Sequence, residues 1–177
     1  VNEGDNTTSL NAAAAYRTER ANAGLNLQVR FNPANNLTLF TGDIAGGIQL
    51  SPVDLQTEFM ARFGSGDLGA ANDSSIMAFC GVLEAELALD KFVIGVDGGF
   101  ATGDRDTSDA RRRTCTFDRD YTIGLMLFEQ NMPVLASTAL TEDVTNRDWS
   151  HTLSGNAVSN ALYLKPQFAF RAHDNLT

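Results

Sequence analysis

Residues 53–63 read VDLQTEFMARF, and their side chains alternate between two kinds. The odd positions are mostly apolar, while the even positions are polar or charged except at Met60. A period of two is typical of a β-strand whose two faces meet different surroundings. This stretch therefore predicts a strand with one apolar and one polar face.

The same period recurs on both sides of this stretch. Residues 76–89 and 92–101 alternate in the same way and are separated only by Asp90 and Lys91, which predicts a hairpin with a very short turn. Residues 25–32 and 162–171 alternate as well, although Pro166 weakens the latter as a central strand and suggests an irregularity near a sheet rim. The chain is thus expected to be all-β, an antiparallel meander.

Several segments leave alternatives open. Residues 83–89 favour a short helix by composition, since Glu, Ala and Leu are good helix formers, but we prefer the strand. Residues 12–23 fit a helix or a strand, residues 121–128 predict a strand that is apolar on both faces, and residues 131–157 show no clear pattern.

In a barrel meander, short turns at one end alternate along the chain with longer loops at the other, but the connections expected here do not follow this order. Residues 32–36, 51–52 and 90–91 predict short turns, whereas residues 64–75 and 103–120 predict long loops. Strict alternation would require residues 37–50 to hold two short strands split near Gly42, or sequence to be missing there. Both explanations stay open at this point.

Composition narrows the class of protein. The chain has 177 residues and a formal net charge of -9, which argues against a general nucleic-acid binder because phosphates require a basic surface. No run approaches the roughly 20 apolar residues of a membrane-spanning helix. Strands of about 9–11 alternating residues could still span a membrane as a closed barrel.

No residue pattern predicts catalysis, a cofactor or a metal. His151 and His173 lie in polar stretches without a nucleophile or ligand pattern, and the acidic residues 103–109 lack the spacing of a calcium loop. Arg111 to Arg113 read as a solvated loop, and the pairing of Cys80 with Cys115 stays open. We therefore expect no enzyme, no cofactor and no metal site.

Three features favour a membrane barrel over a soluble β-sandwich. Isolated charges occur in the middle of the strands, as a wet barrel interior allows, and the strands are longer than the 5–6 residues usual elsewhere. The apolar faces end in aromatic residues, as in the girdles at membrane interfaces. In lipid, backbone groups must all be paired, so such strands must close into a barrel.

A family resemblance agrees with this interpretation. It rests on five motifs: LEAEL (83–87), GGFATGD (98–104), TFDRDY (116–121), LMLFE (125–129) and VSNALYLKP (158–166). Over residues 53–177 the chain resembles large outer-membrane barrels of Gram-negative bacteria, of the porin and alginate-export-like kind, especially those of myxobacteria. The resemblance implies an outer-membrane location and passage of solutes through the barrel; its relatives are longer than this chain.

A short internal repeat also indicates a larger barrel. Residues 31–38, FNPANNLT, resemble residues 170–177, FRAHDNLT, so a further strand is expected after the second copy. We therefore expect residues 1–177 to form a single β-barrel domain that is part of a larger barrel, with the assignment of residues 1–23 uncertain.

The functional expectation is a porin-like channel for passive or facilitated passage of small solutes or polysaccharide. Its partners would be outer-membrane lipid and the solute, with no nucleic acid and an open oligomeric state. The alternative is a soluble or surface-attached β-sandwich that binds carbohydrate. Mixed charges at a constriction would create a transverse field, and the expected lumen-lining residues are Arg30, Glu58, Arg62, Glu84, Glu86, Asp97, Lys165 and Arg171.

Overall fold

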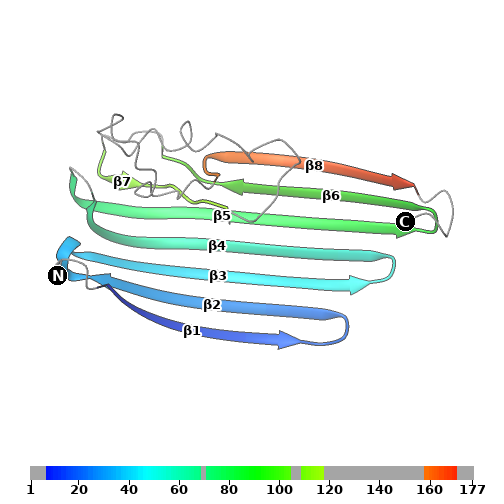
Figure 1. Ribbon diagram of the computed structural model, residues 1–177, viewed down its shortest axis with the longest axis horizontal. Coiled ribbons are helices and arrows are strands. Elements are labelled where there is room, and N and C mark those ends of the chain that lie inside the picture. Colours follow the sequence, from blue (N-terminus) through cyan, green and yellow to red (C-terminus); the bar gives the residue numbers. More distant parts are fainter. Residues whose placement is uncertain (1–6, 69–70, 105–108, 118–157, 171–177) are drawn as a thin grey trace.

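A computed structural model describes residues 7–68, 71–104, 109–117 and 158–170. The chain forms one sheet in which neighbouring long strands run antiparallel (Figure 1). The all-β antiparallel meander expected from the sequence is confirmed. Its elements are β1 (Thr8–Arg17), β2 (Ala21–Asn32), η1 (Pro33–Asn35), β3 (Leu37–Leu50), β4 (Val53–Leu68), β5 (Ala71–Leu89), β6 (Phe92–Ala101), β7 (Arg111–Arg112) and β8 (Ala161–Phe170).

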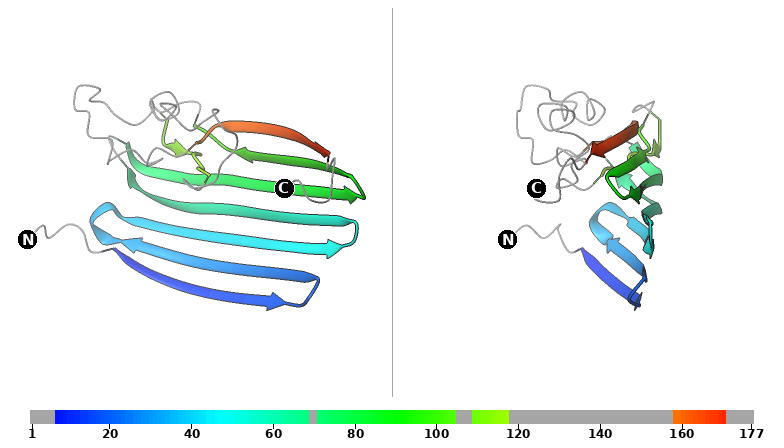
Figure 2. Two further views of the ribbon diagram at one scale, coloured as in Figure 1. Left: turned by 45° about the vertical axis from the view of Figure 1, so that its right-hand side comes forward. Right: turned by 90° about the vertical axis from the view of Figure 1, so that its right-hand side faces the viewer.

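The sheet is an open arc. Its order is β1-β2-β3-β4-β5-β6-β8, and the short β7 pairs parallel with β5 where β6 has ended. Viewed along the strands, the sheet curves from β1 round to β8 (Figure 2). Over the described residues, β1 pairs only with β2 and β8 only with β6, so this part of the chain is not closed into a barrel.

The tight turns gather at one end of the sheet. The connections β1–β2, β3–β4 and β5–β6 lie together there, and we call this the short-turn end (Figure 1). At the opposite end, the β2–β3 turn is fixed by local chemistry. The Asn32 side chain accepts a hydrogen bond from the Ala34 N–H, Pro33 starts the 3-10 turn, and Asn36 closes it with a φ of 46°.

The long loop expected at residues 64–75 is wrong. Strand β4 continues to Leu68 and β5 begins at Ala71, so most of that segment is sheet. Gly64 looks like a turn former, but a Cβ there would lie 2.2 Å from the backbone oxygen of Thr38. Glycine therefore permits a close approach of two strands, which the sequence alone does not distinguish from a turn.

Three open alternatives are settled by pairing between strands. Residues 37–50 form the single strand β3, so neither a split near Gly42 nor missing sequence is needed. Residues 12–23 belong to β1 and β2, joined by a turn at residues 18–20, and residues 83–89 lie within β5. These residues favour a helix by composition but form strands here, because pairing with the neighbouring strands outweighs their local helix propensity.

The remaining expectations concern the far end of the chain. Part of the loop expected at 103–120 contains the short β7. The irregularity expected at Pro166 is wrong, because the register of β8 is continuous there and Pro166 pairs with Val96. The proline is tolerated because β8 has one neighbour in the part described, and a missing N–H can be accommodated at such an edge. The expectations for residues 121–128 and 131–157, His151 and His173 lie outside the described residues.

The apolar face of the sheet is exposed along most of its length. Phe92, Ile94 and Phe100 of β6 are exposed, whereas Gly95 and Ala101 on the opposite face of the same strand are buried. The pattern extends across the sheet, reaching 59% exposure at Ile44 and 86% at Leu162. In the part of the chain that the structure describes, the sheet therefore presents a continuous exposed apolar surface, which is larger than soluble monomers usually show.

Candidate functional site: the polar face of the sheet

The strand register places seven of the expected lumen-lining residues on one face. We call the face opposite the apolar one the polar face. Arg171 lies outside the described residues, and whether this face lines a lumen stays a prediction. The seven residues are Arg30, Glu58, Arg62, Glu84, Glu86, Asp97 and Lys165.

An acidic strip lies on the polar face near the short-turn end. We define it by Asp54, Glu84, Glu86 and Asp97. Asp54 lies directly opposite Glu86, and Glu84 directly opposite Asp97. Like charges placed directly opposite destabilise a sheet, so this arrangement costs folding free energy.

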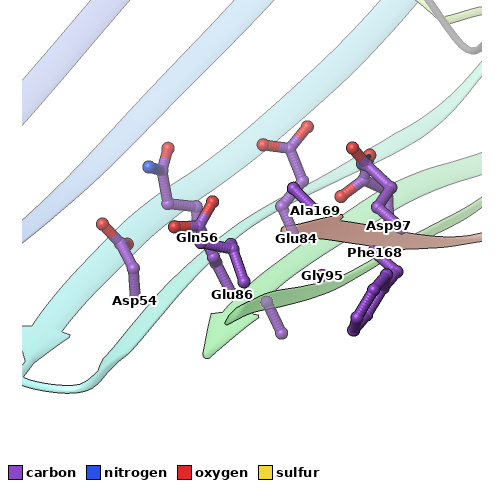
Figure 3. A pocket seen from close by; sticks show the side chains of 11 residues that line it. Asp54, Gln56, Glu84, Glu86, Gly95, Asp97, Phe168 and Ala169 are labelled. Carbon is purple, nitrogen blue, oxygen red and sulfur yellow. Dashed lines mark hydrogen bonds between the residues drawn. The ribbon is translucent and has the colours of Figure 1, made fainter. Parts of the chain in front are cut away.

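The strip lines a shallow hollow. Its carboxylates rise from the same side of the sheet as Gln56, while Phe168 points the opposite way (Figure 3). Two side-chain amides and one cation contact these carboxylates and partly offset their negative charge. The Lys165 Nζ lies 2.8 Å from the Asp97 Oδ2, to which the Gln167 amide also donates, and the Gln49 amide donates to Asp54.

A basic pair occupies the opposite end of the polar face. Arg30 of β2 and Arg62 of β4 lie on this face with only β3 between their strands, and they are two residues apart in register. Arg30 also donates to the side-chain oxygen of Gln28 at 3.5 Å. The sign of the charge on the polar face therefore changes along the strands.

A folded-back segment, residues 109–117, covers part of the polar face. A disulfide joins Cys80 of β5 to Cys115 across 35 residues, which settles the pairing left open by the sequence. Cys115 is fully buried, and the ring of Phe117 meets that of Tyr163 edge-on at 5.8 Å. Their partners in a small core are Ala78, Cys80 and Ala101, with Met60, Val82, Val158, Ala161 and Tyr163 packed against it.

Thr102 ties this segment to the sheet. Its hydroxyl accepts from the Phe79 N–H at 3.0 Å and donates to the Arg113 carbonyl at 2.6 Å. The backbone N–H of Cys115 donates to the Thr102 carbonyl, and that of Phe117 to Val158. The segment is thus fixed by several backbone bonds as well as by the disulfide.

The interpretation of Arg111 to Arg113 as a solvated loop is wrong for Arg112. Arg111 is exposed, but the Arg112 side chain is only 11% exposed and lies 3.9 Å from the Asp104 carboxylate, which is 3% exposed. A buried cation requires such a partner. Arg112 and Asp104 therefore contribute little net charge to the polar face.

Sequence reasoning missed the residues that hold the folded-back segment. Thr102, Phe117 and Tyr163 carry no pattern of their own, because their roles arise only when distant strands meet. Asp54 was also left out of the expected lining residues, although its even position in residues 53–63 placed it with Arg62. The alternation itself was the signal that could have found it.

Within the described ranges, no helix is long and apolar enough to cross a membrane. In the same ranges, no group of three or more His, Cys, Asp or Glu side chains is arranged to hold a metal ion. Comparison with protein-family models, curated proteins and solved structures gives no match. Functional inference therefore rests on the two faces of the sheet.

Proposed function

We propose that the chain forms part of a membrane-spanning β-barrel of the bacterial outer membrane, through which small solutes pass along the polar face. The observation that carries this proposal is the apolar face: it is exposed, it extends over seven strands, and among the described residues it bears no charge between its rims. Lipid is the surrounding that makes such a face favourable.

The chemistry of the apolar face fits a hydrocarbon surrounding. In β4 it presents alternate residues from Val53 to Phe63, and its cross-strand neighbours are equally uncharged. Between its rims, the described part of this face has two hydroxyls: that of Tyr16 near the end of β1, and that of Thr57, which donates to the Val82 carbonyl at 2.9 Å. A polar group facing lipid needs such an internal partner, because no water is available to it.

A row of hydroxyl residues bounds this face at the end away from the short turns. Thr38 lies opposite Ser65, and Ser65 lies opposite Ser75, so the face turns polar along one line across the sheet. Between Phe63 and Val53 the apolar positions span about 33 Å along the strand, at about 3.3 Å per residue. With a barrel's tilt this corresponds to a band roughly 25 Å tall, the height usual for such barrels.

The apolar positions also shift steadily from strand to strand. On β1 they run from Leu10 to Tyr16, which lie level with residues 57–63 of β4. On β8 they run from Leu162 to Phe170 and extend beyond the level of Val53. From β1 to β8 the centre of the apolar positions moves by about five residues, which is roughly 16 Å along the strands. The same six strand steps cover roughly 29 Å across the sheet, so the shift corresponds to a tilt of about 30°. Barrels tilt their strands by a similar angle, roughly 35–45°.

The position of the folded-back segment argues against a β-sandwich. In a sandwich, the second layer would cover the apolar face. Here the chain's own covering segment, with Cys115 and Phe117, packs on the polar face and leaves the apolar face open. The disulfide adds support for an envelope location, since such bonds persist in oxidising compartments.

The test is reconstitution of the full-length protein from detergent into planar bilayers. A barrel pore gives heat-modifiable migration on gels and discrete conductance steps. A protein that stays soluble and monomeric without detergent and never conducts would contradict the proposal. In that case the apolar face is covered by protein, as in the alternative carbohydrate-binding sandwich.

A further inference from the structure

We infer that the polar face is electrically bipolar along the strands and that the pore therefore rectifies ionic current. This inference rests on the proposed function, because it assigns ion selectivity to a face that lines the pore. The specificity-determining residues are the acidic strip at one end and the pair Arg30 and Arg62 at the other.

The short-turn end of the polar face is net negative. At this end, the polar face carries the four carboxylates of the acidic strip and only two cations, Lys165 and Arg17, among the described strand residues. The turn residues add no net charge, since Glu19 and Arg20 offset each other, as do Asp90 and Lys91. Mobile cations therefore concentrate at this end.

The other end of the polar face is net positive. Arg30 and Arg62 lie on this face with only β3 between their strands, and the buried pair of Arg112 with Asp104 is close to neutral. At the same end of the sheet, Asp67 and Asp109 are matched in number by Arg111 and Arg113. Glu58 and Asp43 lie between the two ends along the register. Mobile anions therefore concentrate near the two arginines.

Distance keeps the two ends electrically separate. Arg62 and Asp54 lie on the same strand, eight residues apart, which is about 26 Å in an extended chain. The Debye length is about 8 Å at physiological ionic strength, so neither end neutralises the other there. At 1 M salt this length falls to about 3 Å, and the fixed charges lose most of their reach into a wide pore.

Two oppositely charged zones in series conduct unequally in the two directions. When the compartment at the short-turn end is positive, cations leave the acidic strip toward the middle of the pore while anions arrive there from the arginines. Carriers then accumulate in the middle and conductance rises. At the opposite voltage both carriers are drawn away from the middle, and conductance falls.

The experiment measures single-channel currents of the full-length protein at equal and opposite voltages. In 0.1 M KCl we expect the two currents to differ roughly twofold, and in 1 M KCl to differ by little, because salt screens the fixed charges. The double variant Arg30→Gln with Arg62→Gln should lower the current ratio at 0.1 M and shift the reversal potential toward cation selectivity.

Matched control variants keep the charge at each position and change only the side chain that carries it. Arg30→Lys with Arg62→Lys should retain the current ratio, and Asp54→Asn with Glu86→Gln should lower it, whereas Asp54→Glu with Glu86→Asp should not. Discrete conductance with equal currents in both directions at 0.1 M would overturn this inference and leave the proposed pore standing. Absence of conductance, with a protein soluble without detergent, would overturn both.

Discussion

The two faces of this sheet share the same strands but differ in what they bury. The apolar face contains large side chains that are exposed, whereas the polar face contains the charged residues and is covered over Ala78, Cys80 and Ala101 by the chain's own residues 109–117. In a water-soluble protein these roles would be exchanged. The contrast teaches that exposure alone does not identify the solvent: the chemistry of the exposed residues does.

The largest expected effect comes from a charge placed in the middle of the apolar face. Ile44→Arg should destabilise the membrane-inserted protein by roughly 2–4 kcal/mol, because arginine at the bilayer midplane is poorly solvated. Urea unfolding of the protein in lipid vesicles measures this change. Ala45→Arg is the matched control, since Ala45 is the next residue and lies on the polar face.

The same two variants also show whether the apolar face is surrounded by lipid or by water. Ile44 is 59% exposed, so in water an arginine there would change stability by no more than about 0.5 kcal/mol. Equal stability of the two variants would show that the apolar face does not meet hydrocarbon.

The second prediction concerns the covered part of the polar face. Replacing Cys80 and Cys115 together by serine should lower the free energy of unfolding by about 2–3 kcal/mol, since the disulfide closes a long loop. Protease digestion should then cut within residues 109–117, while the wild type resists unless it is reduced. Unchanged stability and unchanged digestion would mean that the backbone bonds at Thr102 hold the segment by themselves.

A third prediction compares two glycines on opposite faces. A Cβ at Gly81 would lie 2.9 Å from the Phe100 ring and 3.3 Å from the Phe59 ring, so Gly81→Ala should cost about 1 kcal/mol. At Gly95 a Cβ would approach Gln167 no closer than 3.4 Å, so Gly95→Ala should be neutral or slightly stabilising. Thermal unfolding in the same detergent compares the two, and the reverse order would contradict the packing described for the apolar face.

The smallest effect is expected at the acidic strip. Lys165→Gln removes the cation that lies 2.8 Å from Asp97 and should destabilise the protein by less than about 1 kcal/mol, because the pair is partly exposed. Lys165→Arg should keep the wild-type stability. A loss of several kcal/mol in urea unfolding would show that the strip is far better shielded from water than its exposure indicates.

Much of the fold could be predicted from the sequence, because alternation records the two faces directly. The hairpin at Asp90 and Lys91 and the faces of residues 53–63 follow from that pattern alone. The sequence gives a wrong or undecided prediction where pairing with distant strands determines the structure. Gly64 permits close approach to Thr38 rather than forming a turn, and the alanines of residues 12–15 extend because β2 pairs with them.

The site was predicted in part for the same reason. The shared face of Glu84, Glu86 and Asp97 follows from their spacing, but the contacts of the folded-back segment do not. Cys115 lies in a stretch without alternation, so nothing local indicates which face of the sheet it reaches. The separation of acidic and basic ends also required the register, because Arg30 and Arg62 lie on different strands.

The central claim is that the apolar face meets lipid, and tryptophan fluorescence tests it most directly. Trp149 is the only tryptophan, so a Trp149→Phe background accepts a single probe at Ile44 or at Ala45. In vesicles of lipids with brominated acyl chains, we predict strong quenching of the probe at 44 and weak quenching at 45, with the opposite order for aqueous iodide. Quenching of both probes by iodide, and of neither by brominated lipid, would contradict the account.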